Sequence, residues 1–162
     1  ILGAAAKVMP QFGVGGAVKY YSQALPSNSG RGVTGDIGVL FATDSGKFRV
    51  GAVCRNVLGS LKYDSGHTDA FDRSFGAGVA VRPMDNLLIA ADVIWKDGID
   101  ARVGGEFRLG KFAVRAGGGY RDDKLSFSAG AGFLLPSFSI DYAYQTHSIL
   151  PDSHRLSLCV KF

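Results

Sequence analysis

Four side chains near the end of the sequence have the residue types that hydrolytic chemistry uses. They are His147, Asp152, Ser153 and His154. A histidine beside an aspartate or a serine can activate a hydroxyl group or a water molecule as a nucleophile. A polar loop with two histidines explains the same residues, and no nucleophile or orienting group is identifiable on a second element. We therefore expect no catalytic residue, with a hydrolase that uses this His/Asp site as the alternative.

The cysteines and the glycine motifs indicate no further chemistry. Cys54 and Cys159 have neither metal-ligand spacing nor the number that a disulfide framework needs. Gly-x-Gly sequences occur, but none opens a helix after a strand, which excludes a nucleotide-binding loop. We expect the chain to bind no metal and no cofactor and not to be an enzyme.

The composition favours a sheet over a helical domain. The 162 residues include 23 glycines but only 5 prolines, and the formal net charge is +4. This length allows one domain or part of one. Glycine at this density would weaken helices, because each glycine inside a helix costs about 1 kcal/mol relative to alanine. A transmembrane helix needs about 18 consecutive apolar residues, and the sequence has no such run. Any membrane role must therefore use strands.

Alternation of apolar and polar residues is the dominant pattern, and it indicates strands with one apolar face. Between residues 86 and 96, for example, Leu87, Ile89 and Val93 fall on one face, and the other face carries Asn86, Ala90, Asp92 and Lys96. The same alternation predicts about ten strands, at 11–24, 32–43, 47–57, 74–82, 86–96, 101–109, 111–121, 125–135, 137–147 and 155–162.

The connections between these strands form two groups that alternate along the chain. Those at 43–46, 83–85, 110–111 and 136–137 are tight, whereas those at 25–31, 58–73, 96–100, 121–124 and 148–152 are mostly longer. Short turns at one end and longer loops at the other are typical of outer-membrane barrels. The sequence therefore predicts an all-β fold, an antiparallel up-and-down transmembrane β-barrel.

Aromatic residues gather near both ends of the apolar face. Amphipathic rings are expected where a barrel meets the two membrane interfaces. The residues that we assign to these interfaces are Trp95, Tyr120, Tyr144, Phe112, Phe138 and Phe162. The alternative is that the rings form the core of a two-layer sheet protein.

The charged face must point inward if the apolar face meets lipid. An Arg or Lys on the lipid face at the bilayer midplane costs about 2–4 kcal/mol. The residues expected to line the lumen are Lys19, Asp36, Arg49, Arg82, Asp92, Arg102, Glu106, Arg108, Arg115 and Asp141. A soluble carrier barrel for apolar ligands would reverse this orientation, and alternation alone does not distinguish the two.

The charged face has more cations than acids, and two interpretations remain open. It is an interior that favours anions or lipid headgroups, or its charges form ordinary ion pairs across strands. A two-residue turn at 110–111 places Glu106 opposite Arg115, and we expect these two side chains to form an ion pair inside the wall. Because the cations are spread over alternate positions, we do not expect nucleic acid as a partner.

The final segment ends on an aromatic residue, Phe162, with apolar residues at every second position before it. It resembles the C-terminal signal that the barrel-assembly machinery reads in bacterial outer-membrane proteins. Further motifs are Gly16-Ala-Val-Lys-Tyr-Tyr, Gly35-Asp-Ile-Gly-Val-Leu-Phe, Arg102-Val-Gly-Gly-Glu-Phe, Val114-Arg-Ala-Gly-Gly-Gly-Tyr and Ile140-Asp-Tyr-Ala-Tyr. Together these strings resemble the C-terminal part of PorV/PorQ-type outer-membrane proteins of the FadL superfamily of long-chain fatty-acid transporters.

This resemblance implies an outer-membrane barrel larger than the chain itself. Residues 1–162 would be a single transmembrane β-barrel domain or the C-terminal fragment of one, with residues 1–8 as the end of a preceding strand. The family's N-terminal plug has no counterpart in this sequence, so no ligand-binding residue is carried over.

The resemblance also implies a location and partners. We expect the chain in the bacterial outer membrane, in contact with outer-membrane lipid and with the barrel-assembly machinery through the strand that ends at Phe162. The FadL branch implies passage of a hydrophobic small molecule, and the PorV branch implies a role in protein secretion with secretion partners.

Overall fold

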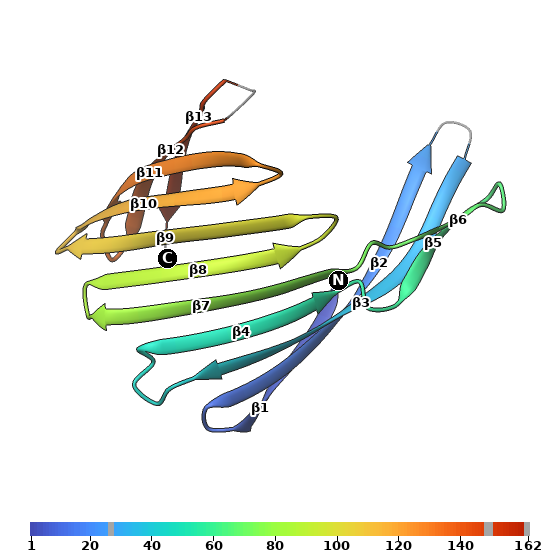
Figure 1. Cartoon of the computed structure of the whole chain (residues 1–162), viewed down its shortest axis with the longest axis horizontal. Coiled ribbons are helices and arrows are strands. Elements are labelled where there is room, and N and C mark those ends of the chain that lie inside the picture. The colour runs from blue at the N-terminus through green and yellow to red at the C-terminus, as the bar shows by residue number, and fades with distance from the viewer. Residues whose placement is uncertain (26–27, 148–150, 161–162) are drawn as a thin grey trace.

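The computed structural model describes residues 1–25, 28–147 and 151–160 and shows one antiparallel β-sheet that curves into an open arch (Figure 1). The predicted all-β fold with up-and-down strands is confirmed. In the part of the chain that the structure describes, no helix is long and apolar enough to cross a membrane.

The strands follow the alternation of the sequence, because successive side chains of a strand point to opposite faces. They are β1 (Leu2–Met9), β2 (Phe12–Leu25), β3 (Asn28–Ala42), β4 (Phe48–Arg55), β5 (Gly59–Tyr63), β6 (Thr68–Ala70), β7 (Ser74–Met84), β8 (Leu87–Trp95), β9 (Ile99–Leu109), β10 (Phe112–Arg121), β11 (Lys124–Leu134), β12 (Phe138–Gln145) and β13 (Ser153–Val160).

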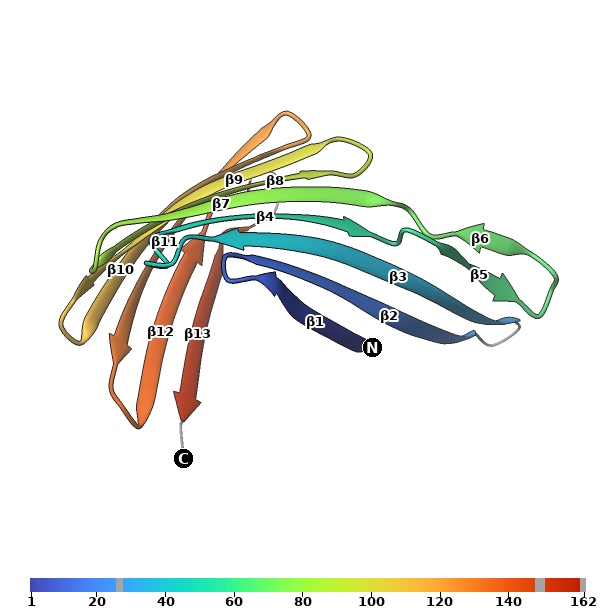
Figure 2. The same ribbon diagram turned by 90° about the horizontal axis from the view of Figure 1, so that it is seen from below.

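Most strands lie beside their neighbours in sequence. The order across the sheet is β1-β2-β3-β4-β7-β8-β9-β10-β11-β12-β13, and β5 pairs with β3 and β6 off this path. Figure 2 shows that the sheet is curved, with the edge strands β1 and β13 lying below the arch formed by the middle strands. Among the described residues, β1 and β13 are the two edges of an open sheet.

The strand at the start of the chain corrects the expected number of strands. The sequence predicts about ten strands and takes residues 1–8 as the end of a preceding one. The structure has a strand there, β1, which pairs with β2 and brings the path across the sheet to eleven strands. Three consecutive alanines, residues 4–6, remove the contrast between the faces there. Eleven strands in alternating directions leave both edge strands running the same way, whereas bacterial membrane barrels close with an even number of antiparallel strands. The eleven strands alone do not meet that rule.

Two connections predicted as loops contain strand instead. β2 continues to Leu25 and β3 begins at Asn28, so only residues 26 and 27 separate them. The predicted loop 58–73 contains β5 and β6, which extend the sheet beside the far end of β3 (Figure 1). Serine and glycine are frequent in these stretches and blur the alternation on which the prediction rests.

The attachment of β5 to β3 depends on Gly59. This residue has φ +108°, and a Cβ there would collide with the backbone oxygen of Val33. Gly66, in the turn after β5, also has a positive φ of +86° but has open space around it.

We expect Gly59→Ala to detach β5 and β6 from β3, because the clash is with backbone and cannot be relieved by a side-chain rotation. Gly66→Ala is the matched control, with a cost of about 1–2 kcal/mol from its backbone conformation alone. Hydrogen exchange of the β5 amides measures the difference. Equal protection of β5 in the two variants would contradict this role of Gly59.

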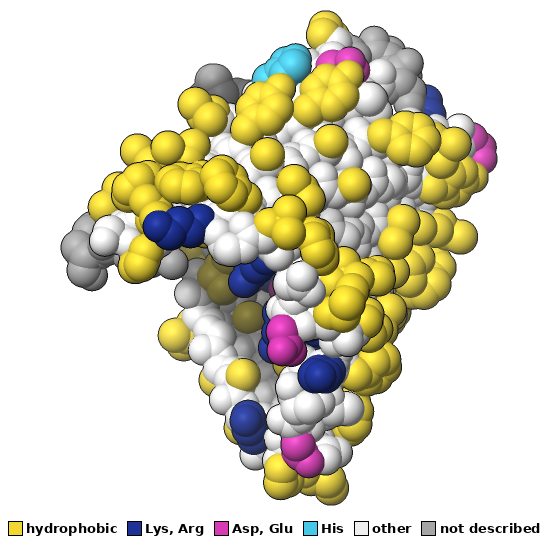
Figure 3. All heavy atoms as spheres, turned by 90° about the vertical axis from the view of Figure 1, so that its left-hand side faces the viewer, with side chains coloured by type: hydrophobic (Ala, Val, Ile, Leu, Met, Phe, Trp, Pro, Cys, Tyr) yellow, Lys and Arg dark blue, Asp and Glu magenta, His cyan; other side chains and the backbone are white. Residues whose placement is uncertain are grey.

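The large apolar side chains do not form a core. Within the described residues, Ala113 is the only buried hydrophobic residue. Side chains from the centre of the apolar face remain open to the surroundings, with Val103 56% exposed and Ile140 41% exposed. Figure 3 shows apolar side chains over the outer surface and charged ones in the hollowed side. A soluble barrel that encloses its apolar side chains does not fit this arrangement.

Candidate functional site

Two adjoining hollows lie on the concave side of the sheet. The larger, of about 960 Å³, is lined by residues of β8–β13, and the smaller, of about 560 Å³, by residues of β3, β4 and β7–β9. They are continuous, because Ala90, Asp92, Asp100 and Arg102 line both. We call this polar face of the sheet the concave wall.

The predicted ion pair between Glu106 and Arg115 is confirmed and is part of a longer chain. The two residues face each other across β9 and β10, and Arg115 Nε donates to Glu106 Oε2 at 2.6 Å. The same guanidinium donates from Nη1 to Asp141 Oδ1 of β12 at 2.6 Å. Arg108 Nε donates to the other Glu106 oxygen at 2.6 Å. Four charges from three strands are thus linked across the wall.

Glycine at position 132 makes room for this chain of charges. Gly132 lies on β11 opposite Asp141 of β12, two residues from Gly130, which lies opposite Arg115 of β10. A Cβ there would lie 2.5 Å from Asp141 Oδ1 and 3.2 Å from Arg115 Nη1. The ion pair between those two side chains passes over the strand that separates them, and a side chain at position 132 would displace the two paired groups.

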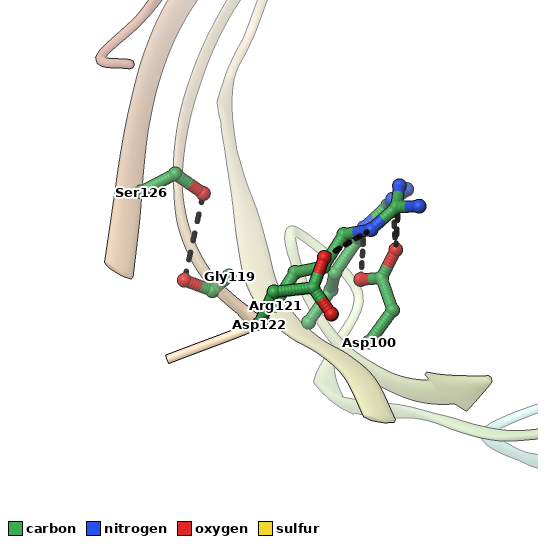
Figure 4. A network of polar contacts seen from close by, with 6 residues as sticks. Asp100, Gly119, Arg121, Asp122 and Ser126 are labelled. Carbon is green, nitrogen blue, oxygen red and sulfur yellow. Dashed lines mark hydrogen bonds and ion pairs between the residues drawn. The ribbon is translucent and has the colours of Figure 1, made fainter. Parts of the chain in front are cut away.

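Further pairs neutralise other charges of the wall. Lys19 Nζ lies 2.8 Å from Asp36 Oδ1, and both side chains are mostly buried. At the loop end, Arg102 binds Asp100 through two hydrogen bonds of 2.9 and 2.6 Å. Arg121 reaches the same carboxylate at 3.8 Å, in the polar network of Figure 4. Asp100 is a wall residue that the sequence prediction assigned to a loop. It is two residues before Arg102 and therefore on the same face of the strand, so alternation extended to residue 100 would have predicted it.

Most of the residues predicted to line the lumen border a hollow. Those that line the two adjoining hollows are Arg49, Asp92, Arg102, Glu106, Arg115 and Asp141. Asp36 borders a third hollow, beside β1–β3. Arg82 and Arg108 follow the alternation of the wall at the turn end of β7 and β9. That the wall encloses a lumen stays a prediction.

The aromatic residues assigned to the membrane interfaces lie at opposite ends of the strands. Trp95, Tyr120 and Tyr144 are at the loop ends of β8, β10 and β12. Phe112 and Phe138 begin β10 and β12 at the turn end. Phe162 lies outside the described residues. Contact of these rings with a membrane stays a prediction.

The His/Asp/Ser group at the loop end is divided between the two faces. On the concave side, His147 Nε2 and Ser153 Oγ are 2.9 Å apart. Asp152 accepts hydrogen bonds from the Tyr144 hydroxyl and from the His147 backbone amide, so its carboxylate does not orient the imidazole ring. His154 Nδ1 lies 2.7 Å from the Tyr142 hydroxyl on the convex side. The arrangement lacks a Ser-His-Asp sequence of contacts.

The hydrogen bond from the Tyr144 hydroxyl, together with that from the His147 amide, holds the pKa of the Asp152 carboxyl below its ordinary value. A lowered pKa in the folded state stabilises the loop above the ordinary carboxyl pKa, and this contribution is lost as the pH falls through the lowered value. We expect acidification below about pH 3.9 to expose the His147 amide to exchange, and Asp152→Asn to expose it already at neutral pH. Protection of the His147 amide, relative to its intrinsic exchange rate at each pH, that is unchanged by acidification and by Asp152→Asn would contradict this.

The two cysteines are free and lie on different strands. Within the ranges that the structure describes, no three His, Cys, Asp or Glu side chains are grouped so that they could hold a metal ion.

No protein-family model and no curated protein matches this sequence. Among solved structures, the fold is similar to that of a mutant of the Rh. blastica porin, with a TM-score of 0.56 at 11% sequence identity. The similarity covers 84% of this chain and 50% of the porin chain, so the chain matches half the length of that porin. At this identity the likeness defines the fold, which is that of a porin-like antiparallel β-barrel wall.

Proposed function

We propose that the chain forms part of a bacterial outer-membrane β-barrel and that its concave wall lines a passage for small water-soluble molecules. The observation that carries this proposal is the orientation of the two faces. Apolar side chains are exposed on the convex side, while ion pairs and small residues cover the concave side. Lipid would cover the first surface and water would fill the second.

The free energy of exposure supports a lipid environment. Each apolar side chain gains about 25 cal/mol for every Å² that it removes from water. On the convex side, valine, isoleucine and phenylalanine side chains from β2 to β13 stay exposed. Monomeric soluble proteins rarely expose contiguous apolar patches of more than a few hundred Å², whereas a bilayer covers such a surface.

Reconstitution into lipid vesicles tests the passage. The full natural chain should make vesicles permeable to small polar solutes, measured by vesicle swelling or by ion current across a planar bilayer. Gly104→Trp should reduce the flux, because a side chain at Gly104 would point to the same face of β9 as Arg102 and Glu106, into the larger hollow. Val103→Trp, on the convex face of the same strand, is the control and should leave the flux unchanged. Vesicles that stay impermeable although the folded protein is inserted would overturn the proposal.

Two finer roles rest on the resemblance of short motifs. Passage of hydrophobic molecules, as in FadL-like proteins, would require an apolar path, whereas the hollows are bordered by charged residues such as Arg102 and Glu106. This favours polar solutes over hydrophobic ones. A PorV-like role in secretion would need partner proteins at the loop end, and co-purification of secreted proteins with the natural barrel would support it over passage.

We propose that the protein is not an enzyme. The support is that Asp152 binds the backbone amide of His147, and that among the described residues no acid forms an ion pair with the His147 ring. An ester substrate incubated with the protein in detergent should stay intact. Hydrolysis that disappears in Ser153→Ala would favour the hydrolase alternative instead.

We also propose outer-membrane lipid and the barrel-assembly machinery as partners. The strand β13 supports this, because its alternate residues Leu156, Leu158 and Val160 are exposed on the convex side. Phe162, at the end of this segment, lies outside the described residues. Deletion of Phe162 should lower the amount of inserted protein in cells without changing its folding in detergent, and unchanged insertion would contradict the role.

A further inference from the structure

The acids and the cations of the concave wall differ in how completely they are paired. Asp36, Asp100, Glu106 and Asp141 each have an ion-pair partner within 4.0 Å. In the described ranges, no acidic group lies within that distance of Lys47, Arg49, Arg55, Arg82, Lys111 or Arg155. Asp92 is the wall acid that has no ion pair among the same residues. The unpaired charge of the wall is therefore mainly positive.

Three of these cations lie together at the turn end of two neighbouring strands. Lys47 precedes β4, Arg49 is its second residue, and Arg82 is near the end of β7. The backbone amide of Arg82 donates to the Lys47 carbonyl oxygen at 2.7 Å, which fixes the two residues side by side. We call Lys47, Arg49 and Arg82 the basic row.

The basic row continues into the smaller hollow. Arg49 and Arg55 occupy the same face of β4, about 20 Å apart at the usual rise of a strand, and both line this hollow. Glycine and alanine residues, among them Gly51, Gly78 and Ala80, lie around them and leave the space open. A small anion could move along β4 from one guanidinium to the next.

The loop end has the opposite charge. The connections at that end contain Asp64, Asp72, Asp97, Asp122, Asp123 and Asp152, against the cations Arg73 and Lys96, whereas those at the turn end contain Asp44 and Asp85 against Lys47 and Lys111. With Arg49 and Arg82 added at the turn end, the charge becomes more positive along the strands toward the basic row. We therefore expect anions to be selected at the turn end of the wall.

We propose that this passage selects small inorganic oxyanions such as phosphate, and that the basic row determines the selectivity. The proposal rests on the proposed function of the wall as the lining of a passage. Rings of Arg and Lys favour anions in pores, and a guanidinium binds an oxyanion through two parallel hydrogen bonds. Unpaired arginines are available for such contacts, whereas those bound to wall acids are not.

Ion selectivity in planar bilayers is the first test. Across a KCl gradient, the full natural protein should pass chloride more readily than potassium. The triple variant Lys47→Gln/Arg49→Gln/Arg82→Gln should lose this preference. The control Arg31→Gln/Lys62→Gln/Arg73→Gln removes the same number of charges outside the wall and should keep it. A current that prefers potassium in the natural protein would overturn the inference and leave the passage intact.

Phosphate binding in detergent is the second test and does not depend on conduction. The natural protein should bind inorganic phosphate saturably. The basic-row variant should bind it with an affinity lower by about tenfold or more, and the control variant should bind it with unchanged affinity. If the basic-row variant loses phosphate binding but the natural protein carries no current, the anion site is supported and the proposed passage is wrong. Equal binding by the natural protein and the basic-row variant would overturn the anion site. Circular dichroism of all variants confirms that the sheet is folded.

Discussion

Replacing Ala91 with arginine is expected to destabilise the folded protein in a bilayer by about 2–4 kcal/mol, the cost of a cation on the lipid face at the midplane. Ala91 is at the centre of β8, between Val79 and Val103 on the convex face. Both valines are exposed, at 36% and 56%. An arginine there would have no water and no acidic partner within the membrane. The free energy of unfolding in lipid vesicles, from urea titration, measures the effect.

The neighbouring residue provides a control with the same chemical change. Ala90 lies on the concave face and lines both hollows, beside Ala80 and Gly104. An arginine at this position has room and water, so Ala90→Arg should change the stability by less than about 1 kcal/mol. If Ala90→Arg were the more destabilising of the two, the convex face would not be the one in lipid.

Replacing Arg115 with methionine should have the second largest effect. This guanidinium binds both Glu106 and Asp141, whose side chains are only 16% and 31% exposed. Its removal leaves two nearby carboxylates without the cation that they share. Glu106 then has one remaining ion pair, with Arg108, and Asp141 has none among the described residues. Because leaving a partly buried charged group unpaired is costly, we expect a loss of about 1–3 kcal/mol.

Arg102→Met is the matched control for the loss of a guanidinium. Its ion pair joins residues of one strand, and its side chain is 62% exposed, so the expected loss is within about 1 kcal/mol. In the Arg115→Met background, Glu106→Gln with Asp141→Asn should recover most of the stability, because no unpaired carboxylate remains. Unfolding titrations that show equal losses for Arg102→Met and Arg115→Met, and no recovery, would contradict the shared role of Arg115.

Alternation is sufficient to predict the strands wherever the two faces differ strongly. Between Leu87 and Trp95 an apolar residue recurs at every second position, and the structure contains β8 over that range. The pairing of Glu106 with Arg115 follows from the two-residue turn between β9 and β10, since such a turn fixes the register of both strands. These features depend on neighbouring residues only.

The features that the sequence did not predict depend on weak contrast or on distant contacts. The start of β3, residues 28–31, contains serine and glycine beside polar residues, so the two faces do not differ there. β5 pairs with β3 rather than with the strand that precedes it, and a positive φ at Asn56 and Gly59 redirects the chain there. Backbone conformation of this kind has no periodic pattern in the sequence.

The pairing of the charges could be predicted only in part. Alternation places Arg49 and Arg102 on the same face, yet Arg102 binds an acid two residues away and Arg49 binds none among the described residues. The difference depends on the side-chain conformation and on where the curved sheet brings acids within reach. This difference separates the charges that stabilise the wall from those that remain available to a solute.

The single tryptophan tests the orientation of the sheet most directly. Trp95 is at the loop end of β8 on the convex face and is 45% exposed. In vesicles of brominated lipids, its fluorescence should be quenched strongly by bromine near the headgroups and less by bromine at the chain ends, while aqueous acrylamide should quench it weakly. Strong quenching by acrylamide with none by brominated lipid would show that the apolar face does not meet the bilayer, and the proposed membrane passage would be wrong.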